Sequence, residues 1–313
     1  MAEKIIVNHV MSQEVRSGIF ESIISYFKKF SPGNITHVQS KDPIDEADIW
    51  HYHRPHLERR LKANSVVTVH HDLMDSDGWL NYESFHPRYS EAKKIICLNS
   101  LQKNYLQKQG LLETVIVPHG YNPEVFSGAQ QKQIKSKYNI LVTSRRYGRR
   151  VKGEAYFIEL LQWLDNSKFS FTLVGQDRSI DRYYLKKFGF ECKTYERLPY
   201  RIYRHLYDSA DFLLMASLHE GGPANIPEAV ASATPIICNP VGMAYDMVQD
   251  DFNGIILSMS PKRDAEKINS NAGDNVWIER IFRNCFSESK LSRAITWKES
   301  VLRNCEIYEE FLK

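Results

Sequence analysis

The sequence predicts an α/β protein with mostly parallel sheets and helices on both sheet faces. Apolar strand-like runs alternate with helix-like segments along the chain of 313 residues, and this alternation is typical of parallel sheets. Two such series are separated by the polar, nearly patternless stretch 123–137. A stretch of that kind between two series indicates an interdomain linker, so we expect two domains.

Composition limits the class of protein. Hydrophobic residues make up 42% of the chain, no apolar run approaches eighteen residues, and the N-terminus enters a strand pattern directly. We therefore expect no transmembrane helix and no signal peptide, and hence a cytoplasmic protein. The five scattered cysteines include no Cys-x-x-Cys pair, which favours reduced thiols over disulfides or a zinc site. The net charge of +3 does not by itself imply nucleic acid.

The first series contains five predicted strands, each followed by polar residues. The strands are 4–10, 47–50, 65–69, 94–98 and 114–117, with helices over 19–30 and from Ser100 to the stop at Gly110. In open parallel sheets, ligands bind at the carboxyl ends of the strands. The polar residues that follow these strands are His51, His53, His70, His71, Asp72, Asn99, His119 and Gly120.

The second series repeats the pattern. Its predicted strands are 138–143, 170–174, 192–195, 212–216, 236–238 and 253–257, and its helices include 153–165 and 199–209. We expect residues 260–275 to be loop-like because they are polar. Two amphipathic helices, about 276–287 and 293–312, end the chain.

The chain is organised around the stretch 211–237. A buried-looking strand ends in a loop with two glycines and a proline, and a small-residue helix and a second strand follow. Glycines let a ligand approach the backbone, and a helix N-terminus attracts anions. Two glutamates, Glu220 and Glu228, bracket the loop, which suggests a nucleotide or nucleotide-sugar site. An alternative for Glu228 is a capping box with Asn225.

A cluster of basic residues follows the strand 138–143. Arg145, Arg146, Arg149, Arg150 and Lys152 fall within eight positions. One interpretation is a solvated basic loop. The other is a phosphate clamp, or a patch that faces an anionic membrane or polymer.

With these motifs in place, the chain resembles the retaining glycosyltransferases of family 4. Their GT-B fold has two facing Rossmann-like domains with a deep interdomain cleft that holds the active site. The resemblance runs from about residue 47 to residue 257, and it depends on a set of motifs that occur in the same order as in the family. Its motifs are Glu220–Glu228 as an E-x7-E loop, Ala229–Ile237 behind it, Ser144-Arg145 with Lys152-Gly153, Leu173–Gly175, Val115–Gly120 and Val66–Asp72.

The resemblance implies a domain division. Residues 1–122 would form the acceptor-side domain, 123–137 the linker and 138–296 the donor-binding domain. The last helix, about 297–313, would pack back on the first domain.

The resemblance also implies roles for individual residues. Arg145 and Lys152 would bind the donor pyrophosphate, Glu228 the ribose hydroxyls, and Glu220 the donor sugar. The remaining donor-side residues would be Gly221, Gly222, Pro223, Ala224 and Asn225 of the loop, with Arg197 and Leu198 beside the base.

One histidine at the end of the strand 65–69 would contact the donor sugar. Strand continuity favours His70 for this position, whereas the following Asp72 favours His71. The acceptor-side residues would be Ser17, Gly18, His51, His53, Asp72 and His119. The loop 11–18 departs from the family, since it contains only one glycine.

The resemblance implies a retaining glycosyltransferase that uses a UDP- or GDP-sugar and a glycan or lipid-linked acceptor, in surface polysaccharide or glycan assembly. Attack from the front face, with the leaving phosphate as base, is the favoured mechanism. We expect no cofactor and no essential metal, because Asp75-Ser76-Asp77 lies in a loop and no other Asp-x-Asp motif is present. Open alternatives are a nucleotide-sugar epimerase, a DNA-modifying enzyme and a non-catalytic nucleotide-sugar-binding protein. Nucleic acid is the less favoured partner, and a peripheral position at the inner membrane face stays open.

Overall fold

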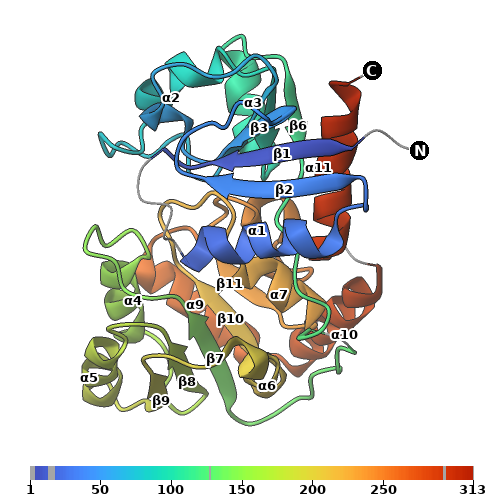
Figure 1. Cartoon of the computed structure of the whole chain (residues 1–313). Coiled ribbons are helices and arrows are strands. Elements are labelled where there is room, and N and C mark those ends of the chain that lie inside the picture. The colour runs from blue at the N-terminus through green and yellow to red at the C-terminus, as the bar shows by residue number, and fades with distance from the viewer. Residues whose placement is uncertain (1–3, 13–17, 127, 292–293, 313) are drawn as a thin grey trace. The chain divides into compact units, whose positions relative to one another are not determined.

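The computed structural model describes residues 4–12, 18–126, 128–291 and 294–312. The chain forms two compact units. Unit 1 comprises residues 1–120 and 295–313, and unit 2 comprises residues 121–294. Each unit is an α/β domain around one parallel six-stranded sheet (Figure 1). None of the described helices is long and apolar enough to cross a membrane.

The sheet of unit 1 has the strand order β2-β1-β3-β4-β5-β6. Its strands are β1 (Ile5–Val10), β2 (Ile35–Ser40), β3 (Ile49–Tyr52), β4 (Ser65–Val69), β5 (Lys94–Cys97) and β6 (Thr114–Ile116). Its helices are α1 (Gly18–Phe30), α2 (Tyr82–Tyr89), α3 (Ser100–Lys108) and α11 (Trp297–Glu310), with a 3-10 turn at Pro55–Leu57.

Helices α1 and α11 cover one face of this sheet. Phe27 of α1 and Tyr308 of α11 pack in one buried cluster with Val7 of β1. The start of α11 is fixed to the segment before unit 2, because the Ser300 hydroxyl donates to the Pro118 carbonyl at 2.8 Å. At Gly120 a side chain would clash with the Thr296 backbone, so only glycine allows this close approach.

Unit 2 has the strand order β12-β11-β10-β7-β8-β9. Its strands are β7 (Tyr138–Thr143), β8 (Phe169–Val174), β9 (Glu191–Tyr195), β10 (Phe212–Met215), β11 (Ile236–Cys238) and β12 (Gly254–Ile256). Its helices are α4 (Glu154–Leu161), α5 (Ser179–Lys187), α6 (Tyr203–Ser209), α7 (Asn225–Ala231), α8 (Ala244–Met247), α9 (Pro261–Gly273) and α10 (Asn275–Leu291), with a 3-10 turn at Tyr200–Ile202.

Three elements differ from the sequence prediction, and one of them is helix α2, which the prediction lacks. Residues 260–275 are not loop-like, since most of them form α9, which begins with a proline in its first turn. Helix α9 has two buried apolar residues, Ala265 and Ile268. Both pack against the core of unit 2 and hold the helix there. The prediction also lacks strand β2, whose outer residues are polar and give a weak apolar pattern.

Candidate functional site: the loops at the carboxyl ends of the unit 2 strands

The basic loop after β7 brings Arg145, Lys152 and Glu220 together. The Lys152 ammonium forms an ion pair with the Glu220 carboxylate, which lies 68 residues further along the chain. Both cations lie over one aromatic ring, because the Arg145 guanidinium is 4.0 Å and the Lys152 ammonium 5.5 Å from the centre of the Tyr147 ring. Two cations therefore lie over one tyrosine ring, and one of them, Lys152, is paired with a carboxylate.

A glycine allows this meeting of distant segments. Gly153, which precedes α4, has a φ of +74°, and a side chain there would clash with the Ala216 carbonyl at the end of β10. The close approach is extended by a backbone hydrogen bond of 2.8 Å from Leu218 to Val151. The loop with Lys152 is thereby fixed beside the loop with Glu220.

A buried arginine holds the first residues of the basic loop. Arg178 is 2% exposed, and its guanidinium donates to the carbonyl (2.5 Å) and hydroxyl (2.6 Å) oxygens of Ser144. The same guanidinium pairs with Asp181 at 2.6 Å, and Asp181 also pairs with Arg146. Because Arg146 is used in this way, Arg145 is the arginine next to Ser144 that stays exposed.

Glu228 of α7 is buried and held by two tyrosines. The Tyr200 and Tyr207 hydroxyls donate to its two carboxylate oxygens at 2.8 and 2.9 Å. Burial raises the pKa of Glu228 to about 7, although both hydrogen bonds act in the opposite direction. The capping-box alternative is wrong, because Ala224 is the N-cap residue and no side chain caps the helix.

The remaining donor-side residues lie around this carboxylate and the loop before it. Arg197 and Leu198 occupy the turn that leads to Tyr200, so the segment predicted for the base reaches Glu228 through that tyrosine. The Asn225 side-chain oxygen is buried and has no hydrogen-bond partner among the described residues. Loop residues 221–224 connect Glu220 to α7, and Gly242 contacts the backbone of this loop closely enough to exclude a side chain.

In unit 1 the two candidate histidines after β4 lie in different surroundings. His71 is buried, its ring stacks on Phe85 at 4.0 Å, and its Nε2 shares a 2.8 Å hydrogen bond with the Tyr89 hydroxyl. Burial lowers the pKa of His71 to about 4. His70 instead shares a 2.9 Å hydrogen bond between its Nε2 and His53 Nδ1. Packing within unit 1 accounts for His71, whereas His70 belongs to a larger histidine cluster.

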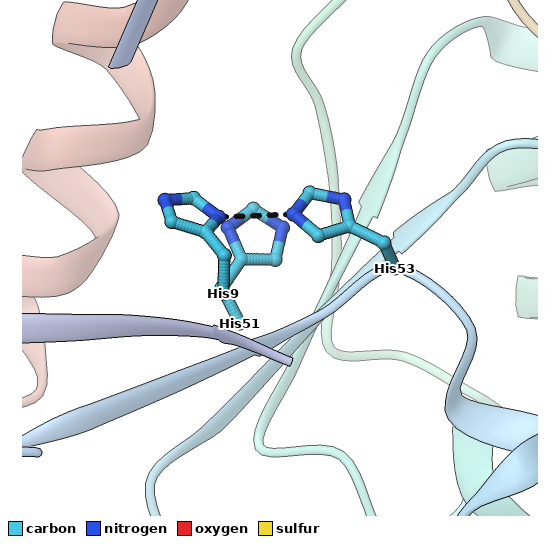
Figure 2. A group of neighbouring side chains, drawn as sticks. All are labelled: His9, His51 and His53. Atoms are coloured by element: carbon cyan, nitrogen blue, oxygen red, sulfur yellow. Dashed lines mark hydrogen bonds between the residues drawn. The ribbon is translucent and has the colours of Figure 1, made fainter. Parts of the chain in front are cut away.

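That cluster lies at the carboxyl edge of the unit 1 sheet. His51 and His53 are fully buried in it, and Figure 2 shows both beside His9, whose Nδ1 shares a 2.9 Å hydrogen bond with His53 Nε2. His119 lies 5.5 Å from His70 between ring centres. A small cavity with room for about one water molecule is lined in part by His51, His53, His70 and His119.

The other acceptor-side predictions lie apart from the cluster. Gly18 is the exposed first residue of α1, and Asp72 accepts a hydrogen bond from the Met74 backbone in a turn. Ser17 lies outside the described residues.

Sequence reasoning missed several residues that the structure places at these sites. In unit 2 these are Tyr147, Arg178, Tyr200 and Tyr207, and in unit 1 His9 and His37. The position of Tyr147, two residues after Arg145, was an available signal because cations stack on aromatic rings. His9 lies inside a predicted strand and His37 in the strand that was missed, so neither followed a strand end in the prediction.

One comparison with known proteins concerns this same region. Residues 127–275 match the family model of glycosyl transferases group 1. The matched segment contains the basic loop, Glu220 and Glu228. An uncharacterized glycosyltransferase of Methanocaldococcus jannaschii is 23% identical over 269 residues, which cover 81% of this chain and 70% of the relative. This segment of the chain is thus similar to group 1 glycosyltransferases.

Solved structures confirm the predicted fold class. The Anabaena protein HepE, in complex with UDP and glucose, superposes with a TM-score of 0.72 at 14% identity, over 98% of this chain and all of HepE (100%). A mutant of S. aureus TarM in complex with UDP and two sugar compounds has a TM-score of 0.65 at 14% identity and covers 91% of this chain. The chain spans 58% of that TarM chain. The fold is GT-B.

Proposed function

We propose that the chain is a glycosyltransferase that takes a sugar from a nucleoside-diphosphate sugar and that unit 2 holds this donor. The observation that carries the proposal is the meeting of Arg145 and Lys152 over Tyr147, with Glu220 paired to Lys152, within the segment that matches group 1. When the bond between sugar and diphosphate breaks, negative charge develops on the leaving phosphate. Fixed cations at that point stabilise the transition state.

Each residue of this group would have a separate role. Arg145 and Lys152 would bind the diphosphate, and the released Glu220 carboxylate would accept hydrogen bonds from the donor sugar. Glu228 has acceptor capacity left after its two tyrosine partners, since each carboxylate oxygen has two lone pairs. It would accept from the ribose hydroxyls, with the base beside Arg197 and Leu198.

We further propose that transfer retains the anomeric configuration, as in family 4, and needs no metal ion, because Arg145 and Lys152 would neutralise the leaving diphosphate. The acceptor hydroxyl would attack from the face that the diphosphate leaves, and the phosphate would take its proton. The UDP complexes of HepE and TarM support a UDP-sugar as donor. A glycan or lipid-linked acceptor and a role in surface polysaccharide assembly complete the proposal.

A panel of UDP- and GDP-sugars, followed by NMR without acceptor, tests this function. We expect slow hydrolysis of one donor, release of the sugar with the donor's configuration, resistance to chelator, and loss of activity in Lys152→Ala. The exposed Lys186→Ala of α5 removes the same charge and serves as the control.

Three results would contradict the proposal in different ways. Isomerised nucleotide-sugar without release would indicate an epimerase. Unchanged release in the Lys152→Ala, Glu220→Ala double variant would show that the donor binds elsewhere. Salt-sensitive binding of duplex DNA would support the DNA-modifying alternative.

A further inference from the structure

Four histidines of unit 1 form a continuous hydrogen-bonded row across four neighbouring strands. The row runs from His37 in β2 through His9 in β1 and His53 after β3 to His70 after β4, in the spatial order of the sheet. Each of the three links is 2.9 Å between ring nitrogens. At the other end, His37 Nε2 shares a hydrogen bond of 2.5 Å with the Ser31 hydroxyl.

Strand register explains the row. His37 is paired with Val7, two residues before His9, and His9 is paired with His51, two residues before His53. His51 is paired with Val66, four residues before His70. Side chains alternate between the faces of a sheet. All four histidines therefore lie on one face, and each is displaced by two residues from its neighbour.

The surroundings keep these imidazoles neutral. The row lies under α1, where Phe27 contacts the rings of His9 and His37. Burial is the first cause that lowers the pKa of all four, to about 4 for His37 and about 3 for His53. The nearby Lys28 and Arg54 act in the same direction.

Hydrogen bonds between the rings, rather than a shared metal ion, explain how the ring nitrogens of the histidine cluster are arranged. One nitrogen each of His9, His51 and His53 lies within 4.8 Å of the others, which is the spacing of a possible metal site. However, both nitrogens of His51 are engaged at 2.6 Å, with the Tyr308 and Thr68 hydroxyls. Its ring stacks on the His53 ring, with the ring centres 4.5 Å apart.

The atoms of the links restrict the tautomers. Every link joins Nδ1 of one ring to Nε2 of the next, and a neutral imidazole has one donor and one acceptor. The four rings must therefore carry their protons all on Nδ1 or all on Nε2. His70 Nδ1, which has no hydrogen bond to the described residues, is then a donor in the first state and an acceptor in the second.

We propose that His37, His9, His53 and His70 form a proton relay between the carboxyl edge of the unit 1 sheet and Ser31. Starting with all protons on Nε2, a proton binds His70 Nδ1, and the Nε2 protons of His70, His53 and His9 each move to the next Nδ1. The proton on His37 Nε2 passes to the Ser31 hydroxyl, which gives one to water. One proton enters, one leaves, and each ring stays neutral.

The relay has a use in the proposed function, and this part rests on that function. Glycosyl transfer frees the proton of the acceptor hydroxyl, and the released nucleoside diphosphate does not keep it at neutral pH. When such a proton reaches His70 Nδ1, the row would carry it to Ser31. His9, His53 and His37 would then be positioning residues that set the state of His70.

Nitrogen NMR of the full chain with labelled histidine tests the relay without donor or acceptor. We expect couplings across the three N–H···N links and the same tautomer for all four rings. We also expect His37→Gln, at the far end, to change the tautomer populations of His70. The exposed His86→Gln of α2 is the matched control.

A mixture of tautomers within the row, or an unchanged tautomer population of His70 in folded His37→Gln, would overturn the relay.

The rate of turnover is a second measurement. His37→Asn keeps an amide near the position of Nδ1 but cannot pass a proton on, so we expect a loss of kcat at unchanged KM and UDP affinity. A normal kcat in His37→Asn would refute the relay and leave the glycosyltransferase proposal intact. Absence of any sugar transfer by the wild type would refute only the glycosyltransferase function.

Discussion

Glu228 is a carboxyl group whose charge near neutral pH depends on its surroundings. It is 5% exposed, and the Tyr200 and Tyr207 hydroxyls are its hydrogen-bond donors. Its pKa is raised from 4.5 to about 7, so folding favours the protonated form. Stability from this group is fully present below about pH 4.5 and is lost as the pH rises through about 7.

We predict that Glu228→Gln gains stability relative to the wild type as the pH rises from 5 to 8. The amide cannot ionise, so the difference grows by as much as about 3 kcal/mol, at about 1.4 kcal/mol per unit of pKa. Urea unfolding at both pH values measures it. The exposed Glu159→Gln of α4 is the control, and an equal pH trend in both variants would refute the assignment.

Lys152 and Glu220 show what sequence could and could not predict at the scale of residues. Their positions after strands and the E-x7-E spacing identified both as donor-side candidates. Their ion pair joins residues 68 positions apart and depends on how α4 packs against β10, which no local pattern contains. The same holds for the tyrosine partners of Glu228, whose hydroxyls meet the carboxylate only after folding.

At the scale of elements, the turn into α4 is the critical feature of the candidate donor site. Gly153 combines a positive φ with contact to the Ala216 carbonyl, and both exclude a side chain. Gly148, in the same loop, has open space around it. A comparison of alanine variants at these two glycines therefore distinguishes the effect of the close contact at Gly153 from the effect of making the loop less flexible.

We predict that Gly153→Ala destabilises unit 2 by at least about 2 kcal/mol, because it adds left-handed strain to a backbone clash. Donor binding should weaken too, since Lys152 would move away from Glu220. Gly148→Ala should change neither property noticeably. Urea unfolding and titration of UDP measure both effects, and equal behaviour of the two variants would contradict this account of the turn.

Elements with strong patterns were predicted and those with weak patterns were not. The run Phe212–Met215 is buried throughout and followed by glycines, and both it and α7 behind it were expected. Strand β2 alternates buried and polar residues at the sheet edge, and α9 has only a narrow apolar stripe. These two elements form mainly because of the structure they pack against, which is β1 for β2 and the core of unit 2 for α9.

At the scale of the whole molecule, the buried histidines of unit 1 and the buried Glu228 of unit 2 respond to acid in opposite directions. Unit 1 contains several buried histidines with lowered pKa values, including His37 at about 4 and His53 at about 3. Such groups give stability that is present above pH 6.5 and is lost as the pH falls toward those values. The raised pKa of Glu228 in unit 2 has the opposite sign.

We predict that acidification from pH 7 to 4 unfolds unit 1 before unit 2. Each histidine that binds a proton on unfolding contributes about 1.4 kcal/mol per unit of pKa shift. Hydrogen exchange with peptide resolution at several pH values separates the units. Earlier loss of protection in β7, β8 and β10 than in β1, β3 and β4 would contradict the prediction.

The two cations and the carboxylate of unit 2, Arg145, Lys152 and Glu220, are the central feature of the proposed donor site. Isothermal titration of UDP and GDP into the wild type, Lys152→Ala and Lys186→Ala tests it directly. We predict that one nucleotide binds the wild type, that Lys152→Ala weakens binding about tenfold or more, in the range for a lost charge-assisted hydrogen bond, and that Lys186→Ala binds normally. Equal affinity in Lys152→Ala and the wild type would contradict the donor site.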